Sequence, residues 1–372
     1  MTFAVPCLFG LEGLVANELR RLGLESVRAE NGRVWFSGGP EAMAQANLWL
    51  RTGERVLLLL AQGRAESFEA LFQLVLTAPL ADYIPKDGQF PVKGHCLNSR
   101  LHSVPDCQAI VKRAAAKCLG QRYGLQWLPE TGSLYALQFS LMNDQFCLFL
   151  DTSGQGLHKR GYRAAGNAAP LRETLAAGMV QLTRYRGREV FWDPFCGSGT
   201  IPIEAALIAK NQAPGLRRHF SAEQFSWVAP DLFPRLREEA KSREFSGDYR
   251  IFGSDNDPRC VSLSMANARK AGVDKLITFR DADAVQAPPP AATGILVCNP
   301  PYGQRMLEQR QAQALAGQFG KHLNTMPGWK TYILSADPEF SRCFGRREDK
   351  RRKLYNGMIQ CSYYMYLGGV GK

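Results

Sequence analysis

The sequence predicts an α/β protein whose C-terminal half is an open, mainly parallel sheet preceded by smaller α+β units. From about residue 165, apolar strand segments alternate with helical runs, which is typical of a parallel sheet with crossover helices. The chain then ends in apolar and aromatic runs joined by Asn356-Gly357, the strongest two-residue hairpin signal. Residues 1–155 contain shorter mixed segments, which we expect to be too short for one large sheet.

The first 155 residues are expected to form two small α+β units, each with helical spacing of apolar residues between strand-like runs. The predicted helices cover residues 11–22, 41–50 and 107–119, and the predicted strands cover residues 33–36, 55–60, 133–141 and 145–150. The last two strands flank Met142-Asn143-Asp144 and form a hairpin.

The C-terminal part is expected to contain five parallel strands and a final hairpin. The strands are predicted at residues 189–193, 249–255, 276–280, 294–298 and 331–334, the helices at 200–210, 258–271 and 309–323, and the hairpin at 353–355 and 358–367. Five parallel strands followed by an antiparallel hairpin are the layout of class I methyltransferases rather than of dinucleotide-binding dehydrogenases.

Composition restricts the class of protein. The 372 residues carry a formal net charge of +12 with 45% hydrophobic residues, which indicates two or three globular domains. The longest purely apolar stretch, residues 56–61, is too short to span a membrane, and the N-terminus lacks a secretory signal, so we expect a cytoplasmic protein. Ten cysteines without a Cys-x-x-Cys pair argue against structural zinc and a disulfide framework, and no metal is expected.

The positive charge is concentrated in the middle of the chain. Residues 91–188 contain 13 basic and 5 acidic side chains, whereas residues 1–90 contain 8 and 10. Lysine and arginine that displace counterions from phosphates supply most sequence-independent affinity for nucleic acids. The distribution therefore favours a polyanionic partner over a merely solvated face.

The first chemical motif is Asp193-Pro194-Phe195-Cys196-Gly197-Ser198-Gly199-Thr200, where the first parallel strand turns into a helix. Glycines there let backbone N–H groups approach a ligand at a helix N-terminus. The motif lacks the Gly-Lys-Ser/Thr of a P-loop and the third glycine of the dinucleotide fingerprint, so neither a nucleoside triphosphate nor a nicotinamide cofactor is favoured. Cys196 could act as a nucleophile, but its place in this loop favours a small buried side chain.

Carboxylates follow the next two strands. Asp255 stands at the end of the second strand, where a ribose diol is held in doubly wound folds. Asp283, or alternatively Asp281, stands at the end of the third strand, where an acceptor could bind an adenine amino group. The long spacing from Gly199 to Asp255 requires an insertion at residues 212–247, whose basic and aromatic side chains either contact substrate bases or only pack.

The sharpest motif is Asn299-Pro300-Pro301-Tyr302-Gly303, directly after the fourth strand. The two prolines fix the backbone, so the Asn299 amide oxygen and the Pro300 carbonyl can each accept one N–H of an exocyclic amine, while Tyr302 stacks on the base. This geometry orients the nitrogen lone pair toward an electrophile and requires no strong base beforehand.

These two motifs together are similar to those of S-adenosylmethionine-dependent amino-methyltransferases acting on nucleic-acid bases. Residues 150–154, 157–163, 170–176, 353–357 and Gly10-Leu11-Glu12 further resemble the THUMP-domain class I RNA methyltransferases, particularly bacterial members similar to the 23S rRNA guanine-N2 methyltransferases. The resemblance covers nearly the whole chain. It implies a ferredoxin-like domain at 1–62, a THUMP RNA-binding domain at 63–155, a basic linker at 156–170 and a Rossmann-like class I methyltransferase domain with a seven-stranded sheet and an antiparallel terminal hairpin at 171–372.

The resemblance also implies roles for individual residues. S-adenosylmethionine would be bound by Asp193, Phe195, Cys196, Gly197, Ser198, Gly199, Thr200, Asp255, Asn256 and Asp283, with a further contact from residues 171–174. The target base would be held by Asn299, Pro300, Pro301 and Tyr302. RNA phosphates would be bound by Lys112, Arg113, Lys159, Arg160 and Arg163.

Three functions from different classes follow from the sequence. The first is methyl transfer to the exocyclic amine of an RNA base, N2 of a guanine in 23S rRNA by resemblance, with 23S rRNA or a ribosome assembly intermediate as partner. The second is a DNA adenine-N6 methyltransferase, which shares the Asn-Pro-Pro-Tyr motif and flips its base out of a duplex. The third is a non-catalytic RNA-binding protein, against which the intact motifs count. The Asn-Pro-Pro-Tyr motif recognises an amine rather than a ring, so it does not identify the base. The choice between rRNA and tRNA and the oligomeric state also stay open.

Overall fold

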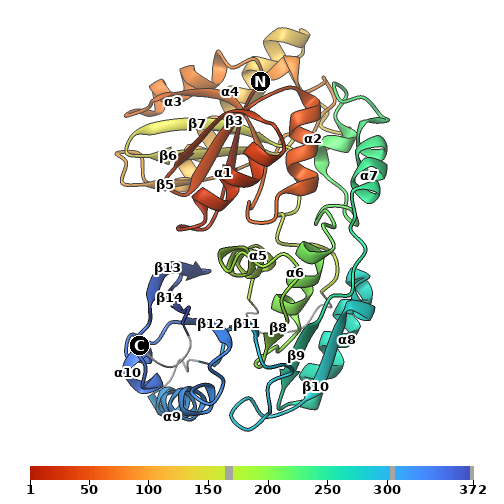
Figure 1. Ribbon diagram of the computed structural model, residues 1–372. Helices are drawn as coiled ribbons and strands as arrows, with labels where there is room; N and C mark the ends of the chain where they lie inside the picture. Colours follow the sequence, from red (N-terminus) through yellow and green to blue (C-terminus); the bar gives the residue numbers. More distant parts are fainter. Residues whose placement is uncertain (164–170, 302–305, 369–372) are drawn as a thin grey trace.

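The computed structural model of the chain describes residues 1–163, 171–301 and 306–368 (Figure 1). These residues form two seven-stranded sheets, one in each half of the chain. In Figure 1 the N-terminal sheet with its helices lies at the top and the C-terminal sheet lies below it.

The N-terminal sheet has the strand order β2-β3-β1-β4-β7-β6-β5. Its strands are β1 (Thr2–Pro6), β2 (Glu25–Glu30), β3 (Arg33–Ser37), β4 (Leu57–Arg64), β5 (Val92–Leu97), β6 (Leu137–Met142) and β7 (Gln145–Asp151). The expectation that these segments form no large sheet is wrong, because β4 pairs with β1 on one side and along its length with β7 on the other. Pairing both sides of β4 removes the exposed edges that two small sheets would each present.

All helices of this half share one core on one face of the sheet. They are α1 (Glu12–Arg21), α2 (Pro40–Trp49), α3 (Phe68–Leu76) and α4 (Val104–Tyr123). Their apolar residues belong to a single buried cluster with inward-facing strand residues such as Phe36 and Leu58. The opposite face carries only a small cluster of four buried residues, Ala4, Trp35, Leu57 and Phe149, all from strands.

The C-terminal sheet confirms the predicted fold class. Its order is β10-β9-β8-β11-β12-β14-β13, with five parallel strands followed by the antiparallel β14 and β13. The strands are β8 (Phe191–Asp193), β9 (Ile251–Asp255), β10 (Ile277–Asp281), β11 (Gly294–Cys298), β12 (Trp329–Ser335), β13 (Lys350–Asn356) and β14 (Ile359–Tyr366). The hairpin is confirmed, but its two-residue turn is Gly357-Met358 rather than the predicted Asn356-Gly357, because Asn356 still pairs with Ile359. Gly357 adopts φ +63° at the first turn position.

Helices cover both faces of this sheet. They are α5 (Glu173–Leu182), α6 (Thr200–Ala209), α8 (Pro258–Ala271), α9 (Met306–Leu323) and α10 (Phe340–Phe344). The first three contribute to one buried cluster, whereas α9 and α10 contribute to the cluster on the other face. Among the described residues, no helix has the length and apolar character needed to cross a membrane.

The insertion at residues 212–247 packs against the N-terminal half. Phe220 and Phe225 are 3% and 2% exposed within the N-terminal core, and Phe225 stacks on Tyr135 with ring centroids 4.7 Å apart. Helix α7 (Leu232–Ser242) lies beside α2 in Figure 1, and its Arg235 pairs with Glu41 at 3.2 Å. Of the two roles that the sequence left open, the described contacts support packing: the insertion fastens the two halves together.

Candidate active site

The first motif forms the loop that joins β8 to α6. Gly197 and Gly199 adopt φ +54° and +79°, which a residue with a side chain rarely adopts. A Cβ atom at Gly199 would lie 3.0 Å from Ser264, whereas one at Gly197 would meet no described residue within 4 Å. Gly199 therefore permits close packing against α8, and Gly197 borders open space where a ligand can approach the backbone.

Side chains of α8 hold this loop in place. Ser264 donates a hydrogen bond to the Gly197 carbonyl at 2.8 Å, and Asn267 donates one to the Ser198 carbonyl at 2.9 Å. Cys196 is 5% exposed with its thiol 3.7 Å from the Ser264 hydroxyl, and burial raises the pKa of that thiol well above its usual value. A thiol that resists ionisation is a poor nucleophile, so Cys196 fills space in the loop.

The predicted acidic residues gather at the same edge of the sheet, because β8, β9 and β10 are adjacent and parallel. Asp255 accepts a hydrogen bond from the Gly197 N–H at 2.9 Å and one from the Asp257 N–H at 3.0 Å. Its carboxylate thus joins the end of β9 to the loop between β8 and α6, which we call the glycine loop and which comprises residues 194–200 with the first residue of α6 included. Asn256 is exposed beside it. Asp283 is half-buried and accepts the Val285 N–H at 3.0 Å, whereas its rival Asp281 ends β10 and is exposed.

Asp193 is 1% exposed at the end of β8. One carboxyl oxygen accepts the Phe195 N–H at 3.1 Å, whereas Oδ2 is buried with no hydrogen-bond partner in the described part of the chain. Burial, with a smaller contribution from the charge of Asp255, raises the pKa of this carboxyl well above its usual value. The loop therefore begins at a carboxylic acid that favours its neutral form.

The second motif follows β11, which lies between β8 and β12. This order places Asn299 at the strand end next to the glycine loop. The Asn299 amide oxygen is buried and has no hydrogen-bond partner among residues 1–163, 171–301 and 306–368. Pro300 is buried and Pro301 is exposed, and the predicted base-stacking residue Tyr302 lies outside the described residues.

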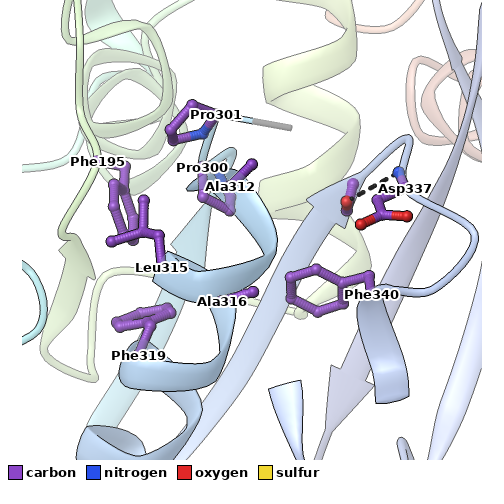
Figure 2. Close-up of a pocket in the computed structure, with 10 residues that line it drawn as sticks. Phe195, Pro300, Pro301, Ala312, Leu315, Ala316, Phe319, Asp337 and Phe340 are labelled. Carbon is purple, nitrogen blue, oxygen red and sulfur yellow. Dashed lines mark hydrogen bonds between the residues drawn. The ribbon is translucent and has the colours of Figure 1, made fainter. Parts of the chain in front are cut away.

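The prolines of the second motif rest on an apolar pocket (Figure 2). Its volume is about 10 Å³, which is enough for at most one water molecule. Phe195 reaches into this pocket from the first motif, and its ring packs edge-on against Phe319 of α9 with centroids 5.0 Å apart. The side chain of Phe195, which was predicted to contact the cofactor, therefore lines the same pocket as the prolines of the second motif and links the two motifs by packing.

The prediction that Arg160 binds phosphate is wrong. Its side chain is 2% exposed, donates to the Leu157 carbonyl at 2.6 Å and pairs with the fully buried Glu204 at 3.5 Å. A phosphate cannot reach a guanidinium enclosed in this way.

Arg163 also makes contacts within the protein. Its guanidinium donates to the Leu171 carbonyl at 2.8 Å and to the Thr200 hydroxyl at 3.0 Å, and it pairs with Glu173 at 3.4 Å. Phosphate binding by Arg163 stays a prediction, and its guanidinium would have to leave these contacts. In the structure Arg163 connects the start of α5 to the glycine loop, two segments for which cofactor contacts were predicted.

The remaining predicted RNA-binding residues differ in their surroundings. Lys112 is held by both oxygens of Glu130 at 2.7 and 2.8 Å. Arg113 is exposed 5.3 Å from the Phe72 ring, and Lys159 is exposed in the linker. RNA binding by these three residues stays a prediction, and Lys112 would have to leave its ion pair.

Sequence reasoning missed Glu54, which joins three parts of the chain. Its carboxylate accepts the Thr174 hydroxyl at 2.5 Å and lies 3.1 Å from His158 and 3.2 Å from Arg172. Burial alone would raise the pKa of Glu54, but the hydrogen bonds and the charges of His158 and Arg172 leave it below its usual value. A lone carboxylate outside any motif gives no sequence signal of such a role.

Comparisons with known protein families match the three parts of the chain separately. Residues 160–365 match the family described as "RMKL-like, methyltransferase domain". Residues 2–57 match the "RlmL ferredoxin-like domain", and residues 65–151 match the "THUMP domain".

Individual relatives extend over the whole chain. The "Putative RNA methyltransferase YpsC" of Bacillus subtilis is 41% identical over 372 residues, covering 99% of this chain and 96% of the relative. The "Ribosomal RNA large subunit methyltransferase K/L" of Shewanella amazonensis is 34% identical over 369 residues, covering 96% of this chain but 52% of the relative, so the chain spans about half of its length. The crystal structure of "SMU.472, a putative methyltransferase complexed with SAH" has a TM-score of 0.93 at 36% identity, covering 100% of this chain and 99% of that chain.

Proposed function

This chain belongs to the THUMP-domain class I RNA methyltransferases, and from that premise we propose that it methylates the exocyclic amine of a base, N2 of a guanine in 23S rRNA. S-adenosylmethionine is the methyl donor of this family, and the similar crystal structure cited above contains S-adenosylhomocysteine. The relatives named as ribosomal RNA large subunit methyltransferases support the choice of 23S rRNA. The guanine assignment rests on the family resemblance.

The observation that carries the amine chemistry is the amide oxygen of Asn299, which is buried and has no hydrogen-bond partner among the residues that the structure describes. An acceptor buried without a partner costs about 1–3 kcal/mol, so it fits a position where a substrate N–H completes the hydrogen bond. With the Pro300 carbonyl as second acceptor, the two N–H groups of an exocyclic amine would be held while the nitrogen lone pair faces the methyl donor. The amine then loses its proton only after the new bond has begun to form, and positioning supplies most of the catalysis.

The residues present fit the donor. The backbone at Gly197 borders open space and can approach the methionine part, while Asp255 and Asp283 offer carboxylate oxygens for the ribose hydroxyls and the adenine amino group. Asp193, Phe195, Cys196, Ser198, Gly199 and Thr200 would shape the loop, with Asn256 beside the adenine. S-adenosylmethionine supplies an electrophilic methyl group on a sulfonium, so the protein needs no metal or nucleophile of its own.

The substrate is tested by incubating the protein and labelled S-adenosylmethionine with large-subunit rRNA transcribed without modifications, bulk tRNA and duplex DNA in separate reactions. Digestion and mass spectrometry then identify the methylated nucleoside. We expect N2-methylguanosine from the rRNA alone. Methyladenine in the duplex DNA would favour the DNA alternative, and a methylated tRNA would move the substrate to another RNA class.

The domain limits 1–62, 63–155, 156–170 and 171–372 stay predictions.

A further inference from the structure

Gly10-Leu11-Glu12 and residues 353–357, two sequence motifs that the catalytic site does not use, lie close together in the structure. Gly10 follows β1, and Arg352 of β13 donates a hydrogen bond to its carbonyl at 2.6 Å. Gly10 adopts φ +91°, and a Cβ atom there would lie 2.6 Å from the Lys353 carbonyl, so only glycine allows this approach. β13 of the C-terminal hairpin is thereby docked on the loop that follows β1 of the N-terminal sheet.

Aromatic rings mark this junction. Phe9 lies edge-on to Tyr355 with ring centroids 5.9 Å apart, and a Cβ atom at Gly32 would lie 3.3 Å from the Phe9 ring. Phe9 nevertheless remains 51% exposed. A large apolar ring held at a fixed place and left half in solvent suits stacking against a planar group.

Phe9 forms one wall of a cleft of about 440 Å³ on the face of the N-terminal sheet opposite its helices. This volume lies within the range of ligand-binding pockets, about 300–1,000 Å³. The cleft is also lined by Arg33, Arg55, His95 and Arg172, and the one acidic residue among its described lining residues is Glu54. Its lining is therefore complementary to an anion.

The charged residues of the cleft are not equally available. Arg55 pairs with Asp151 and Arg172 pairs with Glu54. Arg33 has no carboxylate partner in the described part of the chain; it donates to the thioether sulfur of Met142 at 3.1 Å and lies 5.8 Å from the Trp35 ring. A thioether is a weak acceptor, so the Arg33 guanidinium can form a stronger bond with a phosphate.

The cleft also borders the cofactor side of the catalytic domain. Arg172 lines it and directly precedes α5, while the neighbouring Leu171 carbonyl shares the guanidinium of Arg163 with Thr200 of the glycine loop. An RNA strand passing along the cleft would therefore approach the edge of the sheet that carries both motifs.

We propose that this cleft binds an unpaired stretch of the RNA substrate next to the target nucleotide, with a base stacked on Phe9 and a phosphate on Arg33. The proposal rests on the proposed function, because it concerns how that RNA reaches the site. A single strand suits the cleft better than a duplex, because only unstacked bases can present a face to a protein ring.

The test compares the affinities of the wild-type protein, Phe9→Ala and Arg33→Gln for an unmodified large-subunit rRNA fragment. Fluorescence anisotropy measures these affinities at several salt concentrations. Phe9→Ala should weaken binding about 5- to 100-fold, the range for losing one base–aromatic stack. Arg33→Gln should weaken it and reduce the salt slope by about 0.7, as expected for one phosphate contact on a single strand. Arg342→Ala, an exposed arginine on α10 outside the cleft, is the matched control and should change neither quantity.

The affinity of all three variants for S-adenosylmethionine, measured by calorimetry, should equal that of the wild-type protein. This equality would show that the variants are folded. A benzophenone amino acid at position 9 should cross-link to the RNA. If the wild-type protein methylates rRNA but both cleft variants bind it with unchanged affinity, this inference is wrong while the proposed function stands. If the wild-type protein neither binds nor methylates rRNA, both are wrong.

Discussion

Two buried oxygens at the carboxyl edge of the C-terminal sheet have no partner among the described residues, one on Asp193 and one on Asn299. They end neighbouring strands, β8 and β11, and each belongs to one of the two chemical motifs. Buried polar atoms of folded proteins are almost always hydrogen-bonded, so two orphans at one edge indicate a place where function outweighs stability.

The amide oxygen of Asn299 should act in the reaction rather than in donor binding. Asn299→Ala removes one of two acceptors for the amine and should lower kcat about 10²- to 10³-fold, as for the loss of one preorganised polar contact. Single-turnover assays on rRNA measure the change, and calorimetry should give unchanged affinity for S-adenosylmethionine. Near-normal turnover would exclude the amine-orienting role.

Asp255 should act in donor binding instead. Asp255→Ala removes a carboxylate from the ribose position and also releases the Gly197 N–H, so affinity for S-adenosylmethionine should fall at least about tenfold, one hydrogen bond to a charged group being worth about 1.5–3 kcal/mol. Asp257→Ala is the control, because that carboxylate caps α8 and pairs with Arg259 at 2.8 Å. The opposite ranking of the two variants in calorimetry would transfer the ribose contact to Asp257.

The raised pKa of Asp193 predicts a pH-dependent stability. Because the folded protein holds this proton more tightly than the unfolded chain, the contribution of Asp193 is complete below its unfolded pKa, near 3.9, and declines as pH rises toward the folded value. Asp193→Asn keeps the shape of the neutral acid and does not titrate. Urea unfolding without cofactor should therefore show the wild-type protein losing stability relative to Asp193→Asn between pH 5 and 8. A constant difference across this range would mean that Asp193 is already ionised.

At the scale of elements, the linker that follows β7 alternates between buried and exposed positions. Lys159 faces solvent, whereas Arg160 lies in the interface between the two halves and Arg163 reaches the glycine loop. The sequence shows only a cluster of basic residues here, and a cluster of this kind predicts a phosphate-binding face. Which members are buried depends on Glu204 and Glu173, which belong to helices that come later in the chain.

Substitution of Arg160 should consequently lower the stability of the protein much more than substitution of Lys159. Arg160→Ala leaves the buried Glu204 without its ion-pair partner, with the Tyr162 hydroxyl still donating to it at 3.0 Å, and should lower the free energy of unfolding by about 3–5 kcal/mol. Lys159→Ala should leave stability within about 0.5 kcal/mol of the wild type, as for most surface substitutions. Urea unfolding followed by tryptophan fluorescence measures both. Equal stability of the two variants would contradict the buried position of Arg160.

The elements that the sequence predicted well are those with strong local signals. Residues 294–298 and 258–271 were predicted as the strand and helix that the structure contains, because a buried apolar run and a capped amphipathic helix are local patterns. β2 was missed, since its residues are mostly exposed and carry no apolar alternation. The pairing of β4 with β7 could not be predicted either, because their partner residues lie about ninety positions apart and no local pattern specifies them.

At the scale of the whole molecule, the N-terminal half is one continuous sheet even though two domain families match it. β4 contributes hydrogen bonds to both parts, and the predicted limit between residues 62 and 63 falls inside it. One apolar core runs beneath both parts and includes side chains of the insertion from the C-terminal half. Shared strands and a shared core make independent unfolding of the two parts unfavourable.

The N-terminal sheet should therefore open as a single cooperative unit. Leu141 of β6 is fully buried, so Leu141→Ala should destabilise the sheet by about 2–5 kcal/mol. If the sheet is one unit, native-state hydrogen exchange should show that the opening free energy of amides in β1 and β3 falls by the same amount as in β7, although Leu141 lies on the other side of β4. Leu334→Ala, a fully buried residue of β12, is the matched control and should act first on the C-terminal sheet. A loss of protection confined to β5, β6 and β7 would show that the two matched domains unfold separately despite their common strand.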